Sequence, residues 1–267
     1  MAEYSIAENF SQYFQIRFAD TKALRQEAFR IRYGVYSSEL GWEPENERQM
    51  ETDECDDYAY HCLLEHKRTG VFAGCIRLII PPADNPELQL PFERYCLDSA
   101  MPEVVDTTKM PRGGFGEISR LAVLASFRRR EKEKNMPYVL NPVNPETVYS
   151  EEERRNFPNI AMGLYLAGVA LADICRHQGM VVMMEPRLNR RLKRFGLPFK
   201  QIGHPMDYHG TRAMFYLEKD DFGSDLSEQL KDLYDVISAD LTEQISLKQF
   251  GGESCQFLIP DTDVTDR

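Results

Sequence analysis

The chain has 267 residues, of which 42% are hydrophobic and 28% charged, a composition typical of a globular protein with a sizeable core. Its formal net charge of -11 argues against nucleic acid as a partner, because neutralising phosphates requires a basic surface. The longest apolar stretch, residues 160–175, is too short to cross a bilayer comfortably and contains Asp173, so no integral membrane segment is expected.

Cysteine usage and the first residues favour a cytoplasmic protein. Six scattered cysteines in a chain of this length do not form the disulfide framework of a small secreted domain. Residues 1–10 also lack the basic start and apolar run of a secretory signal. We therefore expect cytoplasmic residence and reduced thiols.

The first half of the chain alternates strand-like and helical patterns. The expected elements are a strand at 14–18, a helix at about 21–39, an acidic irregular stretch at 42–57, strands at 60–66 and 71–80, a surface crossing at 81–114 and a strand at 117–124. The four residues 67–70 between two of these strands suit a hairpin turn. Antiparallel pairing is therefore expected early in the chain.

The second half begins with a charged segment rich in Pro and Asn, which indicates a surface insertion at 126–158. The expected elements after it are a helix at 160–177, a strand at 180–185, a short basic helix at 188–195, and strands at 199–202 and 211–218. This order indicates an α/β (α+β) fold with a mixed sheet. Residues 1–222 would form the main domain, and 223–267 an amphipathic helix and a flexible tail.

Charged and aromatic residues gather near the predicted first helix. Arg32 and Tyr36 are four residues apart and share one helical face, and Trp42 is the only tryptophan. Three carboxylates follow in the acidic stretch, namely Glu51, Asp53 and Asp56. A solvated acidic loop beside an ordinary helix would also explain this pattern.

Three charged residues interrupt apolar strands. Arg77, Glu117 and Arg120 are expensive to bury unless they are paired, and the acidic stretch can supply partners for the arginines. These residues could form a structural ion-pair network or a functional site, and neither interpretation excludes the other.

Taken in order, these motifs resemble a known enzyme family. Arg32-x-x-x-Tyr36, Leu40-Gly41-Trp42, Glu51-x-Asp53-x-x-Asp56, Arg77-Leu78 and Glu117-x-x-Arg120 are similar to the motif set of the acyl-homoserine-lactone (autoinducer) synthases. They resemble still more the relatives of that family, namely the long-chain N-acyl amino acid synthases and the acyltransferases associated with the PEP-CTERM/exosortase system. The resemblance covers roughly the first half of the chain by motif and the remainder by element order.

The resemblance implies a GNAT-like fold, with a mostly antiparallel central sheet splayed between two strands and flanked by helices. It implies that Arg32, Asp53, Arg77, Glu117 and Arg120 line one polar cleft, walled by Tyr36 and Trp42, with Glu51 and Asp56 among the substrate-binding residues. Tyr36 stands where phenylalanine is more usual. Glu117 and Arg120 would be catalytic.

The implied reaction moves a fatty acyl group, of long chain in this interpretation, from a thioester to an amine. Glu117 is our candidate general base, and backbone N–H groups around Leu121, Ala122 and Val123 are candidates for stabilising the oxyanion. Strand alternation would put Glu117 and Arg120 on opposite faces, so a shared cleft requires a bulge or a twist between them.

The donor would be an acyl-phosphopantetheine thioester, carried by acyl carrier protein or coenzyme A, and no tightly bound cofactor is implied. Two basic segments follow the strands that would flank the donor cleft; they include Arg128 and Arg129 in the first and Arg190 and Arg191 in the second. A solvated helix face is the alternative for either segment.

Other chemistries lack a supporting pattern. Cys55, His61, Cys62 and His66 resemble metal ligands only superficially, since His61 and Cys62 are neighbours in a strand and point to opposite faces, so no metal site is predicted. We expect transfer to an amino acid or a similar small amine. The alternatives are autoinducer synthesis with S-adenosylmethionine as acceptor, and a non-catalytic module that binds acyl chains or a carrier protein.

Overall fold

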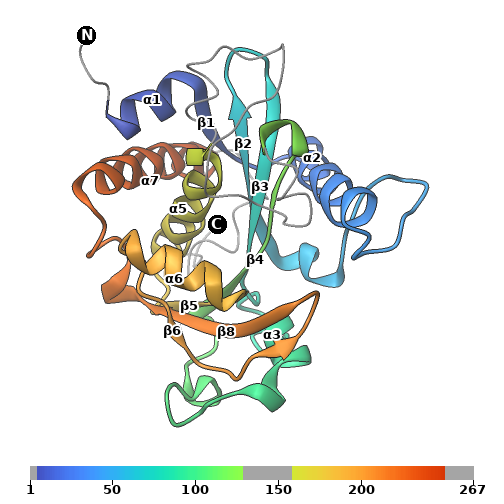
Figure 1. The fold of residues 1–267 in the computed structure, drawn as a ribbon, viewed down its shortest axis with the longest axis vertical. Coiled ribbons are helices and arrows are strands. Elements are labelled where there is room, and N and C mark those ends of the chain that lie inside the picture. The colour runs from blue at the N-terminus through green and yellow to red at the C-terminus, as the bar shows by residue number, and fades with distance from the viewer. Residues whose placement is uncertain (1–4, 129–157, 250–267) are drawn as a thin grey trace, which may run out of the picture.

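The computed structural model describes residues 5–128 and 158–249 (Figure 1). A single twisted sheet runs through it in the order β1-β2-β3-β4-β5-β8-β6, with β7 paired to β8. The strands are β1 (Phe14–Phe18), β2 (Ala59–His66), β3 (Val71–Ile79), β4 (Phe115–Val123), β5 (Gly179–Met184), β6 (Lys200–Gln201), β7 (Met206–Asp207) and β8 (Thr211–Glu218). Only β4 and β5 are parallel among these pairs, so the mixed, mostly antiparallel sheet is confirmed.

Helices flank this sheet. They are α1 (Ile6–Tyr13), α2 (Lys22–Arg32), α3 (Pro91–Tyr95), α5 (Pro158–Ile174), α6 (Pro186–Arg194) and α7 (Glu228–Gln249). Short 3-10 turns occur at Glu54–Tyr58, Leu97–Ser99, Thr107–Lys109, Ala125–Phe127 and Lys219–Asp221. The predicted helix over 21–39 exists but changes character, because α2 continues as a π-helix over Tyr33–Glu39. The predicted insertion falls mostly on residues 129–157, and the predicted flexible tail on 250–267, both outside the described residues.

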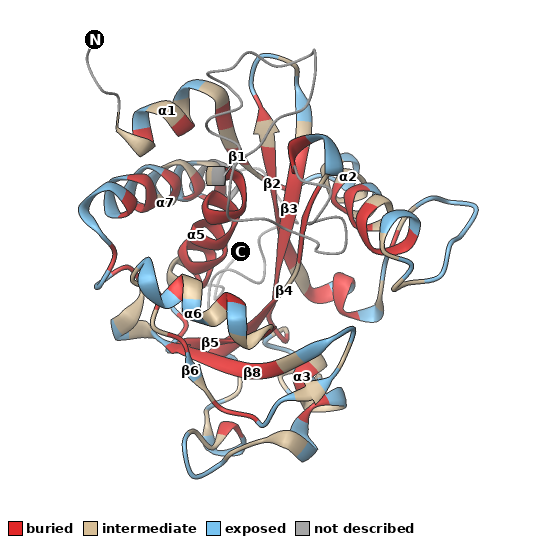
Figure 2. Cartoon of the chain, viewed as in Figure 1, coloured by how far each residue is buried: buried red, intermediate tan, exposed pale blue. Residues whose placement is uncertain are grey.

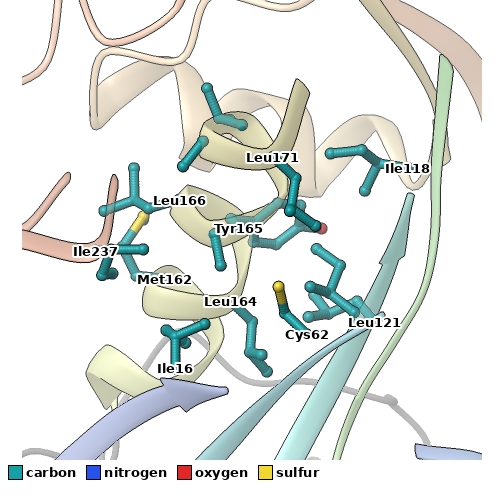
Figure 3. Close-up of a cluster of buried hydrophobic side chains, with 14 of the residues drawn as sticks. Ile16, Cys62, Ile118, Leu121, Met162, Leu164, Tyr165, Leu166, Leu171 and Ile237 are labelled. Atoms are coloured by element: carbon teal, nitrogen blue, oxygen red, sulfur yellow. The ribbon is translucent and has the colours of Figure 1, made fainter. Parts of the chain in front are cut away.

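Strand alternation divides the core between the two faces of the sheet. Cys62 and Leu64 of β2 point into the large cluster formed with α5, whereas Leu63 between them packs under α2. Helix α5 is apolar on all sides and its residues are buried almost throughout, as Figure 2 shows. Figure 3 shows Leu164, Tyr165 and Leu171 of α5 among side chains of the sheet.

The C-terminal helix α7 covers the outer strand of the sheet. Its apolar stripe joins the main core and contacts α5, α1 and β1; the stripe consists of Leu230, Leu233, Ile237, Leu241 and Ile245. Both ends of the Gln244 side-chain amide bond to the β1 backbone: its oxygen accepts from the Phe18 N–H at 2.9 Å, and its nitrogen donates to the Ile16 carbonyl at 2.9 Å. Edge strands expose unpaired backbone groups, so this contact protects β1 from pairing with other chains. The domain boundary at 222 stays a prediction.

No helix within the described ranges is long and apolar enough to cross a membrane. Helix α1 was missed at the sequence level. Its start carries a capping box, in which the Ser5 side chain accepts from the Glu8 N–H and the Glu8 carboxylate accepts from the Ser5 N–H. The Ser-x-x-Glu spacing could have revealed it.

Candidate active site

A hollow of about 370 Å³ opens on the sheet face that also carries α2 and α3. Its wall is built from the loop after the π-helix, the acidic turn (residues 51–58), α3, β3, β4 and the turn before β8. Seven of the sequence-predicted residues are Arg32, Tyr36, Trp42, Asp53, Arg77, Glu117 and Arg120, and the hollow is lined by all of these except Arg32. Arg32 lies directly behind the wall, fully buried.

A bulge in β4 brings Glu117 and Arg120 to the same hollow. Cys75 pairs with Ala122 and Arg77 with Ser119, so one β3 residue lies opposite two residues of β4. Arg120 has a φ of 53°, a left-handed conformation rare for a side chain of its size. The extra residue places Arg120 on the face of Glu117 and Ser119 instead of the opposite one. The bulge required by the sequence argument is therefore present.

An ion-pair network forms the floor behind the hollow. The Arg32 guanidinium donates to Asp56 through Nη1 at 2.6 Å and Nη2 at 3.0 Å, and its Nε donates to Glu51. Arg77 Nη1 contacts Asp53 at 2.7 Å and Asp56 at 2.8 Å. Burial alone would raise the pKa of Asp56, but the two arginines hold it well below its ordinary range. A solvated acidic loop, the alternative at the sequence level, does not fit this burial.

Arg120 connects this network to the hollow. Its Nη2 lies 3.1 Å from Glu51 Oε1 and 3.2 Å from Asp53 Oδ2. The guanidinium carbon also lies 5.8 Å from the centre of the Tyr36 ring. Arg32, Arg77 and Arg120 thus meet Glu51, Asp53 and Asp56, and Arg120 Nη2 also lies 3.5 Å from Glu43 Oε1, so each buried charge has a partner of opposite sign.

His61 of β2 lies against the same network, a position that sequence reasoning did not assign. Its Nε2 is 3.5 Å from Asp56 Oδ1. Burial, reinforced by the nearby Arg32, lowers the pKa of His61 to about 3, so the imidazole is neutral near pH 7. It adds no charge to the three pairs.

Glu117 has a different environment from the paired carboxylates. It is 2% exposed, and its Oε2 accepts a hydrogen bond of 2.8 Å from the Phe92 N–H at the start of α3. Burial raises the pKa of Glu117 to about 8, against the opposing effects of that N–H and of Arg77 and Arg120. A carboxyl group whose pKa lies near the working pH suits proton transfer.

Aromatic rings form the opposite wall. Tyr36 and Trp42 stack with centroids 5.9 Å apart, and Trp42 in turn stacks on His209 at 5.3 Å. Tyr208 meets His209 edge-on, and Tyr95 of α3 stacks on Tyr208. The predicted aromatic wall thus continues into the turn before β8.

The Tyr36 hydroxyl has a structural partner. It donates to the Leu121 carbonyl at 2.7 Å, next to the bulge, and both groups are buried. We predict that Tyr36→Phe lowers the free energy of unfolding by about 1 kcal/mol, because a buried carbonyl loses its donor. Urea denaturation would measure this. Tyr33→Phe is the control and should have a smaller effect, because the Tyr33 hydroxyl makes no hydrogen bond within the described residues.

The chain is similar to known acyltransferases. The family model described as an acetyltransferase (GNAT) domain matches residues 31–136, which span the π-helix, the acidic turn and β4. The chain has a GNAT-like fold and is an N-acyltransferase. An acyl-homoserine-lactone synthase of Aeromonas hydrophila is 26% identical over 226 residues, covering 82% of this chain and 93% of the relative. A second, of Aeromonas salmonicida, is 27% identical and covers 68% of this chain and 72% of the relative.

Solved structures show the same fold. The CoA-dependent acyl-homoserine lactone synthase BjaI, determined with SAM and isopentyl-CoA, matches with a TM-score of 0.55 at 16% identity, covering 84% of this chain and 89% of its own. TofI, in a ternary complex with an inhibitor and MTA, matches with a TM-score of 0.54 at 16% identity, covering 85% and 99%. The curated relatives are named as enzymes, which favours catalysis over the non-catalytic module.

The acyltransferase has a second, smaller cavity where β4 and β5 separate. Their pairing ends at Ile118 and Val182, although both strands continue. The cavity of about 50 Å³ there is lined by Leu121, Tyr165 and Met184 among others. It shares with the larger hollow Tyr36, Ile118, Ser119, Arg120, Met183 and Arg212. The splay expected from the resemblance is thus present, and it meets the hollow.

The predicted donor-binding residues occupy different environments. Leu121 lines the smaller cavity, whereas the side chains of Ala122 and Val123 are packed into the core on opposite faces. Arg128 is also buried and is paired with Glu39, so it does not offer an exposed cation for docking. Arg129 lies outside the described residues.

Helix α6 presents the second basic segment to solvent. Leu188 and Leu192 anchor it in the core, Arg190 is exposed and Arg191 is half-buried. Neither arginine has an ion-pair partner within residues 5–128 and 158–249. The helix begins two residues after Met184, which lines the smaller cavity, so this cationic surface lies near the splay.

Sequence reasoning missed several residues of the hollow. They are Phe92, Arg94, Tyr95, Ser119, Met183, Tyr208, His209 and Arg212. Ser119 stood inside the quoted motif, and its Oγ accepts from Arg77 Nε at 3.0 Å. The others come from α3, β5, the turn before β8 and β8 itself, and only the tertiary fold brings them to the motif residues.

Proposed function

We propose that this acyltransferase moves a fatty acyl group from a phosphopantetheine thioester to the α-amine of an amino acid. One observation carries the proposal: the buried Glu117 carboxyl lines a hollow that shares wall residues with the cavity at the β4/β5 splay. A transferase must bring an amine and a thioester together, and two adjoining cavities suit that requirement.

The reaction needs no covalent enzyme intermediate. The acceptor nitrogen attacks the thioester carbonyl, the C–N bond forms, and its surplus proton passes to Glu117 directly or through water. The C–S bond then breaks, and the leaving sulfur receives the proton, so an amide and a free thiol result. Backbone N–H groups of β4 beyond Ile118, where pairing with β5 has ended, are our candidates for stabilising the oxyanion.

The assay is direct. The purified protein would be incubated with decanoyl and palmitoyl thioesters, on acyl carrier protein or coenzyme A, and with either amino acids or S-adenosylmethionine. Mass spectrometry would identify the product. Formation of N-acyl amino acids supports the proposal, and absence of any N-acylated product from all combinations would contradict it.

Autoinducer synthesis is the second candidate. The curated relatives are named acyl-homoserine-lactone synthases, and BjaI was solved with SAM, so S-adenosylmethionine is a credible acceptor. A product formed only with S-adenosylmethionine would favour this candidate. The link to the PEP-CTERM/exosortase system and cytoplasmic residence both stay predictions.

Carrier protein, as opposed to coenzyme A, is our proposed donor because α6 exposes a cationic surface near the splay. We predict that Arg190→Glu with Arg191→Glu raises the KM for acyl carrier protein at least tenfold, with a much smaller effect on the KM for acyl-CoA. Steady-state kinetics at 50 and 200 mM salt would measure it, since screening weakens charge steering.

Lys231→Glu on the exposed side of α7 is the matched charge reversal and should change neither KM. Equal losses with both donors in the α6 variant would contradict docking of a carrier on α6.

A further inference from the structure

The arginines of the hollow differ in their partners. Arg77 and Arg120 are paired with the acidic turn, and Arg94 is paired with Glu54. Arg212 of β8 has no carboxylate partner within the described ranges. Its Nε is buried without a hydrogen-bond partner there. An unpaired, partly desolvated guanidinium in a binding hollow is expected to meet an anion of the substrate.

Arg212 also lies at the right place for the acceptor. It lines both cavities, so it stands at their junction, where the reacting atoms must meet. Its guanidinium carbon lies 5.3 Å from the centre of the Trp42 ring, which limits where the group can turn. In strand order only β5 separates β8 from the β4 strand of Glu117. Arg212 lies just beyond the last β5–β8 pair, Met184 with Ala213, at the end where β4 and β5 have separated.

We infer that Arg212 binds the α-carboxylate of the acceptor and thereby directs the α-amine towards Glu117. This inference rests on the proposed function and names the residue that would recognise the carboxylate of its α-amino acid acceptor, whether a free amino acid or S-adenosylmethionine. A guanidinium can hold a carboxylate through two parallel hydrogen bonds, which fixes orientation as well as charge.

The test compares acids with their primary amides, which keep the amine and side chain but lose the negative charge. L-Leucine and L-phenylalanine, with leucinamide and phenylalaninamide, would be assayed with decanoyl thioester. The wild type should prefer the acid at least tenfold in kcat/KM, and Arg212→Gln should lower this acid-to-amide ratio at least tenfold. Arg212→Lys should retain part of the preference. Arg30→Gln, on the exposed side of α2, is the matched control.

Turnover of the amides also reports whether the Arg212→Gln variant is folded. A ratio that stays unchanged, or parallel losses for acid and amide, would overturn the inference. A binding measurement tests the inference without turnover. Calorimetry with N-decanoyl-phenylalanine and its amide should show that Arg212→Gln loses the preference of the wild type for the acid over the amide. If the wild type acylates no amine, the proposed function fails, and the calorimetric preference alone decides the role of Arg212.

Discussion

Replacing Glu117 by Gln is expected to lower kcat by 10²- to 10⁴-fold, the range that general-base catalysis contributes. Gln keeps the size of the side chain and an oxygen that can accept the 2.8 Å hydrogen bond from the Phe92 N–H. It cannot take a proton from the attacking amine. Single-turnover kinetics with a loaded thioester would isolate the chemical step, and KM for both substrates should change far less than kcat.

The pH profile gives a second signature of the same group. Burial raises the pKa of Glu117 to about 8, so most of the free protein carries the protonated, inactive form at neutral pH. We expect kcat/KM of the wild type to rise with pH and to reach half of its maximum near pH 8, and we expect Glu117→Gln to lack this rise. Titration of the acceptor amine affects wild type and variant alike, so comparing the two profiles removes its contribution.

Stability should change in the opposite direction. A carboxyl whose folded pKa is raised favours folding below its unfolded pKa, and that contribution is lost as pH rises through about 8. The wild type should therefore lose stability relative to Glu117→Gln as pH rises from the ordinary pKa of 4.5 to about 8, and lose no more above that. Glu65→Gln, on β2 and paired with Arg17, is the control for both measurements. An unchanged kcat in Glu117→Gln would remove Glu117 from the mechanism.

Much of the fold was accessible from the sequence because local patterns determined it. The alternating runs gave β1, β2, β3 and β8 with nearly correct ends, and the Lys67–Gly70 turn was confirmed. The π-helix after Arg32 was not predictable from periodicity, since its start leaves the apolar spacing almost unchanged. Strand β7 was missed because two residues give no periodic signal.

The site was predictable in part for a related reason. Charged residues within apolar strands require partners, and this argument linked Arg77 and Arg120 to the acidic turn. The bulge between Glu117 and Arg120 followed from strand alternation together with the shared cleft that the family resemblance implied. Arg212 gave no such signal, because it stands near the start of β8 among exposed residues, where an arginine is ordinary. Arg128 followed a basic run and was assigned to docking, but the fold buried it against Glu39.

The ion-pair network makes the second large prediction. Asp56→Asn is expected to lower the free energy of unfolding by about 3 kcal/mol, because removing one partner of a buried pair leaves charge uncompensated. Asp56 serves both Arg32, which is fully buried, and Arg77, and Asn can donate where those arginines need acceptors. Urea denaturation would measure the loss, and the distortion should also reduce acyl transfer, because Asp53 and Arg120 share the network.

The neighbouring Asp57 provides a matched control. Asp57 is exposed, so Asp57→Asn should change the free energy of unfolding by less than about 0.5 kcal/mol. The pKa of Asp56 is held below its ordinary value, so its stabilising effect is present above about pH 4 and is lost as pH falls further. The stability gap between wild type and Asp56→Asn should accordingly be widest near neutral pH and shrink below pH 4. Equal effects of the two substitutions would show that the network does not hold the site in place.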